Sequence, residues 1–154
     1  MVLVELSRRR LELAAGLVEP DAAVAAEATD TVAAVRELTE GRGADVIIVA
    51  AGSGRAQEDA LQMAARRGTV SFFGGLPKDR PAITLDANIV HYREVGIVGA
   101  NGSTPAHNRQ ALELIASGAV PVADLITHRL PLEDTVEGIH TVTRGEAIKV
   151  TVQV

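Results

Sequence analysis

The feature that most constrains the fold is the run ADVIIVAA at residues 44–51, in which only Asp45 is polar. A strand this apolar is typical of a parallel sheet that helices cover on both faces. A helix is predicted to follow over residues 55–67 and to end at Gly68, and TVSFFG at 69–74 predicts the next strand. This strand–helix–strand order predicts an α/β fold.

The rest of the chain repeats this order, which predicts a Rossmann-like domain with a mostly parallel sheet and helices on both of its faces. Further strands are predicted at residues 2–6, 22–26, 95–100 and 147–154, and further helices at about 8–15, 31–40, 104–117 and 132–143. The segment 84–94 is ambiguous and is expected to form a short helical turn, whereas GGLPKDRP at 74–81 is expected to be a loop.

Capping residues mark the ends of several of these helices. The predicted N-terminal caps are Ser7, either Thr29 or Asp30, and Thr104, which a proline follows. Gly16 and Gly118 are predicted to end the first and the third of these further helices. In the helix that starts after Thr104, Ala111, Leu112 and Ile115 share one side, which we expect to be its inner face.

The composition excludes several kinds of partner and of metal site. The chain has 154 residues, a length for one domain, and a net charge of −5 without a basic block, which argues against nucleic acid as a partner. It has no cysteine, which excludes disulfides and thiolate metal sites, and its four histidines lack the spacing of a metal site. Because no long apolar span occurs, a cytoplasmic protein without a membrane partner is expected.

The segment AGSGRAQ at 51–57 is similar to the G-x-G-x-x-G loop that binds the pyrophosphate of a dinucleotide. Its third glycine position is Gln57, a large polar residue where helix and strand need a small one. Such a loop also needs an acid about 20 residues later, at the end of the next strand, but that strand ends in SFFGG. Both tests fail. The acid at a strand end is Glu5 instead, which implies that the fingerprint strand precedes this chain.

Six stretches follow one another in a specific order. They are VLVELSRRRLELA, ELTEGRGADVIIVAAGS, GTVSFFGGLP, GIVGANGSTPAHNRQALELIASG, LITHRLPLED and GEAIKV. Together they resemble the medium-chain zinc-dependent alcohol dehydrogenases, and most closely their sorbitol and threonine dehydrogenase-like branch. The resemblance covers nearly the whole chain, but residues 17–28 depart from the family pattern, so the strand at 22–26 is the weakest of those predicted.

In that family, a subunit joins a zinc-binding catalytic domain to a Rossmann domain. The resemblance implies that residues 1–154 are the NAD(P)-binding Rossmann domain from its second strand onward, with a C-terminal return strand at about 147–154. Zinc ligands and catalytic residues would lie in the absent domain, so none is assigned here. Without the first strand its two neighbours lack a partner, and we hypothesise that the C-terminal IKVTVQV or a segment of a second chain fills the gap.

The resemblance also implies which residues bind the cofactor. Glu5 would accept hydrogen bonds from the adenosine ribose and favour NAD, whereas Arg10 would lie near the adenosine and, with its neighbouring arginines, leaves NADP open. The nicotinamide end would lie against three strand ends, formed by Ala51 and Gly52, by Gly74, Gly75 and Leu76, and by Gly99, Ala100 and Asn101. Lys149 would reach the pyrophosphate. The alternatives are solvated charges at Glu5 and Lys149 and, for the glycines, turns that need a positive φ.

The function implied by the resemblance is reversible hydride transfer between a secondary alcohol or polyol and NAD(P), with zinc in the absent domain. The chain alone is expected to be inactive. Residues 95–99 resemble the edge strand of the family's dimer, so a homo-oligomer is expected, and His128 is expected to be structural. Two alternatives stay open: a stand-alone domain that binds nucleotides without catalysis, and a dimerisation domain that only associates with other subunits.

Overall fold

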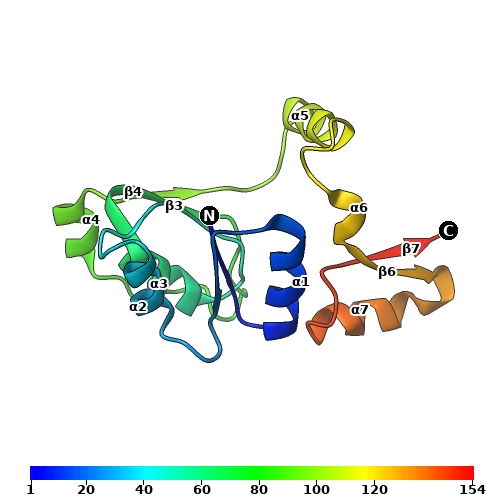
Figure 1. The fold of residues 1–154 in the computed structure, drawn as a ribbon, viewed down its shortest axis with the longest axis horizontal. Coiled ribbons are helices and arrows are strands. Elements are labelled where there is room, and N and C mark those ends of the chain that lie inside the picture. Colours follow the sequence, from blue (N-terminus) through cyan, green and yellow to red (C-terminus); the bar gives the residue numbers. More distant parts are fainter. The chain divides into compact units, whose positions relative to one another are not determined.

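The computed structural model describes all 154 residues, and its elements fall into two compact parts (Figure 1). The terminal part comprises Met1–Thr29 and Ser103–Val154, and the central part comprises Asp30–Gly102. Every strand pair in either part is parallel. The predicted α/β class with parallel sheets is therefore confirmed.

The central part is built around a three-stranded sheet with the order β3-β4-β5. Its elements are α2 (Thr31–Leu38), β3 (Ala44–Val49), α3 (Gly54–Met63), β4 (Ala64–Phe72), α4 (Ala87–Arg93) and β5 (Gly96–Gly99). Val49 lies level with Phe72, and Phe72 lies level with Gly99. All three strands therefore end along the same edge of the sheet. The ambiguous segment before β5 does form the short helix that was expected, α4.

Helix α3 packs on β3 and β4 and supplies much of the core of this part. Its residues Ala60 and Leu61 are 1% and 2% exposed, and Val70 of β4 is fully buried. Burying a leucine or valine side chain in this way stabilises the fold by about 1.5–3 kcal/mol. Asp30 caps α2, since its side chain accepts a hydrogen bond from the Ala33 N–H, which decides between the two caps that the sequence allowed.

The helix after β3 is shorter than the sequence predicted. It ends at Met63, and the next residues belong to β4, so the predicted end at a glycine is wrong. Ala64 is fully buried and pairs with Ala44 of β3. The Arg36 side chain donates a hydrogen bond of 2.6 Å to the carbonyl of Gln62. Strand pairing and this donor satisfy backbone groups that a longer helix would have satisfied.

Strand β3 is not buried on both faces, although its sequence predicted that it would be. Val49 is 6% exposed, whereas Val46 and Ile48, on the other face of the strand, are each 67% exposed. Only one face of β3 is therefore covered. β3 also has a free edge, because its only partner is β4.

The terminal part contains two separate pairs of parallel strands, β1-β2 and β6-β7. Its elements are β1 (Val2–Glu5), α1 (Arg8–Val18), β2 (Ala22–Ala25), α5 (Pro105–Ala116), α6 (Val122–Leu125), β6 (Ile126–Pro131), a 3₁₀ turn (Leu132–Asp134), α7 (Thr135–Thr143) and β7 (Lys149–Gln153). The weak strand prediction at β2 is confirmed. Helix α6 and strand β6 were not predicted, and β7 begins two residues later than expected.

The C-terminal strand does not fill the gap that the sequence implied. β7 pairs only with β6, β1 pairs only with β2, and β3 pairs only with β4. The hypothesis that IKVTVQV inserts beside β1 or β3 is therefore wrong for this chain. β1 and β3 each keep one edge whose backbone N–H and C=O groups have no strand partner.

Helix α1 begins as predicted and ends later. Ser7 caps its N-terminus, but the helix continues through Gly16 and ends just before Glu19. Glu19 has a φ of 44°, the left-handed conformation that glycine usually takes at a helix end. Pro20 follows and cannot continue a helix, so the chain ends α1 here rather than at the glycine.

Helix α5 leaves its apolar residues exposed. It begins at the predicted Thr104 cap, which accepts a hydrogen bond from the His107 N–H at 3.3 Å. None of its residues is buried, and Leu112 and Ile115 are 66% and 39% exposed. The prediction that these residues and Ala111 form an inner face is therefore wrong within this chain.

Helix α7 lies on β6 and β7 through its small residues. Its buried positions are Gly138 and Thr141. A Cβ atom on Gly138 would lie 3.1 Å from the Leu130 side chain and 3.2 Å from that of Val150, so the missing side chain lets the helix approach the strands. The more apolar side of α7, with Ile139 at 60% exposure, lies open.

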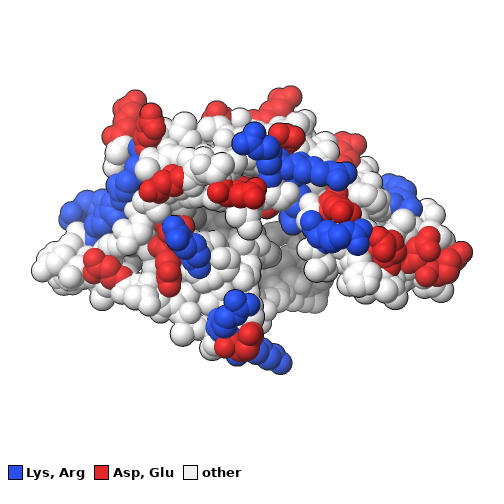
Figure 2. Space-filling model, turned by 90° about the horizontal axis from the view of Figure 1, so that it is seen from below, with Lys and Arg blue, Asp and Glu red and all other residues white.

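The surface is charged and mixed in sign. On the face drawn in Figure 2, the Lys and Arg side chains lie interspersed with the Asp and Glu side chains. The longest helix, α5, has 12 residues, and none of the helices combines the length and the apolar character that crossing a membrane requires.

Candidate cofactor site

The loops that follow β3, β4 and β5 meet at the carboxyl edge of the central sheet. Two backbone hydrogen bonds connect them to the neighbouring strand ends: Gly74 N–H to the Val49 carbonyl at 2.7 Å, and Ala100 N–H to the Phe72 carbonyl at 3.3 Å. Seven of the predicted cofactor residues lie in these loops, and an eighth, Gly99, is the last residue of β5; the seven are Ala51, Gly52, Gly74, Gly75, Leu76, Ala100 and Asn101. One edge of one sheet therefore carries all of the residues predicted for the nicotinamide end.

Gly74 is at this edge because two backbone segments approach each other closely. A Cβ atom there would lie 2.6 Å from the carbonyl oxygen of Ala51, which no side chain could tolerate without a shift of the backbone. A Cβ atom on Gly52 would lie 3.1 Å from the carbonyl oxygen of Gly75. None of the predicted site glycines has a positive φ, so the alternative explanation by turn conformation is wrong for them.

Gly75 and Gly99 have no such reason within the chain. Both are exposed, neither has a positive φ, and a Cβ atom on either would have no neighbour within 4 Å. The fold of this part would therefore accept a larger residue at both positions. A glycine that the fold does not need leaves the backbone accessible to another molecule.

Gln57 connects the start of α3 to the same edge. Ser53 caps the helix by accepting a hydrogen bond from the Ala56 N–H at 3.3 Å. One turn further on, Gln57 is only 5% exposed, and its Nε2 donates a hydrogen bond of 3.1 Å to the carbonyl of Gly74. The residue that does not fit the G-x-G-x-x-G pattern thus forms a buried hydrogen bond between α3 and the loop after β4. Sequence reasoning noticed it as a misfit but did not assign it a partner.

Glu5 and Arg10, the residues predicted for the adenosine end, belong to the terminal part. Glu5 is the last residue of β1, and its Oε1 accepts a hydrogen bond from the Ser7 N–H at 3.0 Å. Its Oε2 lies 3.7 Å from the guanidinium of Arg10. The two side chains are 27% and 38% exposed, so the carboxylate is oriented by its neighbours while remaining accessible.

The remaining predicted residue of the terminal part, Lys149, is exposed at the start of β7. Its backbone carbonyl accepts a hydrogen bond from the Thr127 hydroxyl at 3.1 Å. The same hydroxyl lies 3.0 Å from Nδ1 of half-buried His128. The Thr127 hydroxyl thus connects β6 to β7 through Lys149, and His128, its neighbour in β6, contacts the same hydroxyl.

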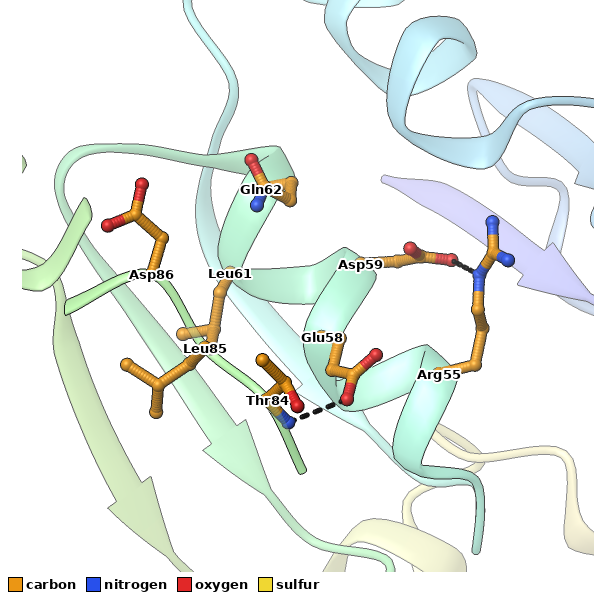
Figure 3. A pocket seen from close by; sticks show the side chains of 8 residues that line it. All are labelled: Arg55, Glu58, Asp59, Leu61, Gln62, Thr84, Leu85 and Asp86. Carbon is orange, nitrogen blue, oxygen red and sulfur yellow. Dashed lines mark hydrogen bonds and ion pairs between the residues drawn. The ribbon is translucent and has the colours of Figure 1, made fainter. Parts of the chain in front are cut away.

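A groove of about 290 Å³ lies elsewhere in the central part, between α3 and residues 84–86 (Figure 3). Its carboxylates are already engaged. Glu58 accepts a hydrogen bond from the Thr84 N–H at 2.7 Å, and Asp59 pairs with Arg55 at 3.1 Å. None of the predicted cofactor residues lines this groove, and the Glu58–Thr84 hydrogen bond fastens the 84–86 segment to α3.

No group of three or more His, Cys, Asp or Glu side chains in the structure is arranged to hold a metal ion. One cluster of ionic contacts joins Arg144 to Glu137 and Glu146 at the end of α7. Arg144 donates hydrogen bonds to both carboxylates and holds the pKa of each below its usual value. These three groups form a structural cluster on the surface.

Comparison with known proteins gives matches to dehydrogenases. Residues 1–117 match the family described as zinc-binding dehydrogenase. Over 130 residues the chain is 28% identical to a sorbitol dehydrogenase from Halalkalibacterium halodurans, which covers 84% of this chain and 37% of that protein. Over 151 residues it is 29% identical to an L-threonine 3-dehydrogenase from Bacillus licheniformis, which covers 97% of this chain and 43% of that one.

Solved structures give the same answer. A protein described as a zinc-binding dehydrogenase from Sinorhizobium meliloti, solved with NADP bound, matches with a TM-score of 0.87 and 26% identity. The match covers 98% of this chain and 44% of that one. The chain spans less than half the length of these relatives. The resemblance to the sorbitol and threonine dehydrogenase-like branch is confirmed. The chain belongs to the zinc-binding dehydrogenase family.

Proposed function

We propose that this chain is the cofactor-binding part of an oxidoreductase that transfers a hydride between NAD(P) and a secondary alcohol or polyol. The observation that carries the proposal is the carboxyl edge of the central sheet. Gly75 and Gly99 leave the backbone exposed there, although the fold itself does not require glycine at either position. Ligands of parallel α/β sheets bind beyond this edge. Two of the relatives are named for sorbitol and L-threonine, and both compounds carry a secondary alcohol.

The proposed role of this edge is to hold the nicotinamide end. A carboxamide carries one acceptor oxygen and two donor N–H groups, which suit the exposed backbone N–H and C=O groups of a loop. Gly75 and Gly99 would let a planar ring approach the backbone without a side chain in the way. Holding the ring in one orientation is the protein's contribution, because the cofactor itself supplies the hydride chemistry.

Glu5 and Arg10 are proposed to bind the adenosine end, and Lys149 to bind the pyrophosphate. The Glu5 carboxylate keeps lone pairs free beside its contacts with Ser7 and Arg10, so it can accept hydrogen bonds from ribose hydroxyls. Its negative charge disfavours a 2′-phosphate, which favours NAD. Arg10 offers a cation to the same phosphate, and the relative from S. meliloti was solved with NADP, so NADP is the alternative cofactor.

The family description implies a zinc ion, and the residues of this chain do not fit one. They include no cysteine, and no cluster of potential ligands occurs in the structure. In an enzyme of this kind, zinc would polarise the alcohol oxygen and lower its pKa. Residues outside this chain would have to hold it. We therefore expect no oxidation of sorbitol or L-threonine by the purified chain, and measurable turnover would contradict this expectation.

The test of the proposed function is a titration of the ¹⁵N-labelled chain with NADH, followed by amide NMR, which detects binding even at a Kd of about 1 mM. The expected result is that the amides of Gly75, Gly99 and Asn101 shift, while amides along the groove at Thr84 do not. Absence of any shift with NADH and with NADPH would overturn the proposal.

The preference between the two cofactors has its own test. Glu5→Gln removes the charge and keeps the shape, so binding of NADPH should strengthen relative to NADH by about three- to tenfold, the net value of about one hydrogen bond. The control is Glu12→Gln, an exposed carboxylate on α1. An unchanged NADH-to-NADPH ratio in Glu5→Gln would remove Glu5 from the proposed site.

We also propose that the chain forms a homo-oligomer through β5. This strand is at the edge of its sheet, and its Ile97 and Val98 are 37% and 47% exposed. An unpaired apolar edge favours pairing with another strand. Val98→Lys should shift the mass measured by light scattering toward the monomer, whereas Leu112→Lys on α5 should not. A monomeric wild-type chain would contradict this part of the proposal.

A further inference from the structure

Gln57 is a buried polar side chain with one partner, and this partner lies at the proposed cofactor edge. Its Nε2 donates to the Gly74 carbonyl at 3.1 Å, and the residue is 5% exposed. Its neighbours on the same face of α3, Ala60 and Leu61, belong to the apolar core. A buried amide in such surroundings is unfavourable unless it is hydrogen-bonded, so this bond fixes where the Gly74 carbonyl points.

The direction of the Gly74 carbonyl decides the direction of the next N–H group. Gly74 C=O and Gly75 N–H belong to one peptide unit, which is planar and trans, so the two groups point in opposite directions. With the carbonyl turned toward α3, the Gly75 N–H points away from it. This N–H has no acceptor within the chain, and Gly75 is exposed.

Two other contacts hold the residue from which this peptide starts, Gly74. The Gly74 N–H donates to the Val49 carbonyl at 2.7 Å, which anchors the loop to the end of β3. The Cα of Gly74 lies against the backbone of Ala51, where even a Cβ would come within 2.6 Å of an oxygen. Backbone contacts therefore hold Gly74 in place, and the Gln57 hydrogen bond is what fixes the orientation of the peptide that follows it.

We infer that Gln57 is a positioning residue for the nicotinamide end of the cofactor: it orients the Gly74–Gly75 peptide so that the Gly75 N–H donates to an acceptor oxygen of the ligand. The inference rests on the proposed function. In this role Gln57 does not contact the ligand itself. It holds the Gly75 N–H, which does contact the ligand, in the orientation that binding needs. Without the amide, the Gly74 carbonyl loses its partner and the peptide can rotate.

The test compares two ligands that differ only at the nicotinamide end, NADH and ADP-ribose, on the full chain. Gln57→Met keeps the length of the side chain and removes the donor. It should weaken NADH binding by about three- to tenfold and leave ADP-ribose binding within about twofold of wild type. Gln62→Met is the matched control, because Gln62 is an exposed residue of the same helix. It should change neither affinity.

A second variant keeps the inference testable if Gln57→Met disturbs the fold, which the dispersion of its amide spectrum would reveal. Gly75→Pro removes the donor itself at an exposed position without neighbours, and should cause the same loss for NADH alone. Suppose that the wild-type chain binds both ligands. If both variants then bind NADH as tightly as wild type, or lose affinity for both ligands equally, the proposed role of Gln57 is wrong and the proposed function stands. If the wild-type chain binds neither ligand, both fail together.

Discussion

The two parts of the chain bury their apolar residues very differently. Ten of the thirteen buried apolar residues belong to the central part, whereas the terminal part contributes only Leu11, Val24 and Ala147. The central part is one continuous segment whose helix α3 covers two neighbouring strands. The terminal part is assembled from both ends of the chain and leaves α5 and one side of α7 exposed. The central part, a continuous segment whose helix covers its sheet, therefore forms a core of its own. The terminal part, with its two separate strand pairs, buries few apolar residues.

The largest effect is expected from the core of the central part. Leu61→Ala should lower the free energy of unfolding by about 2–5 kcal/mol, because Leu61 is almost fully buried and the shorter side chain leaves a cavity in the core. The measurement is urea denaturation followed by circular dichroism. The matched control in the terminal part is Leu112→Ala, at 66% exposure, which should stay within about 0.5 kcal/mol of wild type. A cost at Leu112 equal to that at Leu61 would break the comparison, since α5 would then have a packed partner.

A medium effect is expected at the edge where the central part carries the proposed site. Gly74→Ala should destabilise the chain by about 1–3 kcal/mol, because the new Cβ would meet the backbone of Ala51. Gly75→Ala, one residue away, meets nothing and keeps its N–H, so its unfolding curve should match wild type. The same urea titration compares the two. Equal costs would mean that the two glycines share one role, contrary to their surroundings.

The sequence predicted best those features that depend on neighbouring residues. The caps Ser7 and Thr104 and the strand that becomes β3 were read from local patterns, and the structure has them. The end of α3 was missed, because Ala64 leaves the helix to pair with Ala44, twenty residues earlier. The strand β6 was missed for a similar reason: its apolar residues are few, and it is a strand through its pairing with β7.

The candidate site shows the same limit. The order of strands sufficed to bring the three predicted loops to one edge, because parallel strands end together. The role of each glycine did not follow from the sequence. Gly74 lies against another backbone segment and Gly75 faces open space, but the sequence does not distinguish two adjacent glycines. Gln57 could be recognised as a misfit, but its partner is a carbonyl seventeen residues away whose direction only the folded loop defines.

The smallest effect is expected from the surface cluster of the terminal part, and its sign depends on pH. Arg144 donates to Glu137 at 2.8 Å and to both oxygens of Glu146 at 3.0 Å, and these hydrogen bonds hold both carboxyl pKa values below their ordinary 4.5. A carboxylate whose pKa is depressed by folding stabilises the folded state above its unfolded pKa. That stabilisation is lost as the pH falls through the folded pKa.

Arg144→Gln should therefore lower the Tm slightly at neutral pH, and the difference from wild type should shrink as the pH falls below 4.5. Added salt should shrink it as well, because exposed ion pairs are screened. The control is Arg8→Gln, an exposed arginine of α1 in the same part of the chain. A difference that persists unchanged in acid would mean that Arg144 stabilises the terminal part by packing its side chain. The terminal part would then be stabilised by side-chain packing, which is otherwise a feature of the central part.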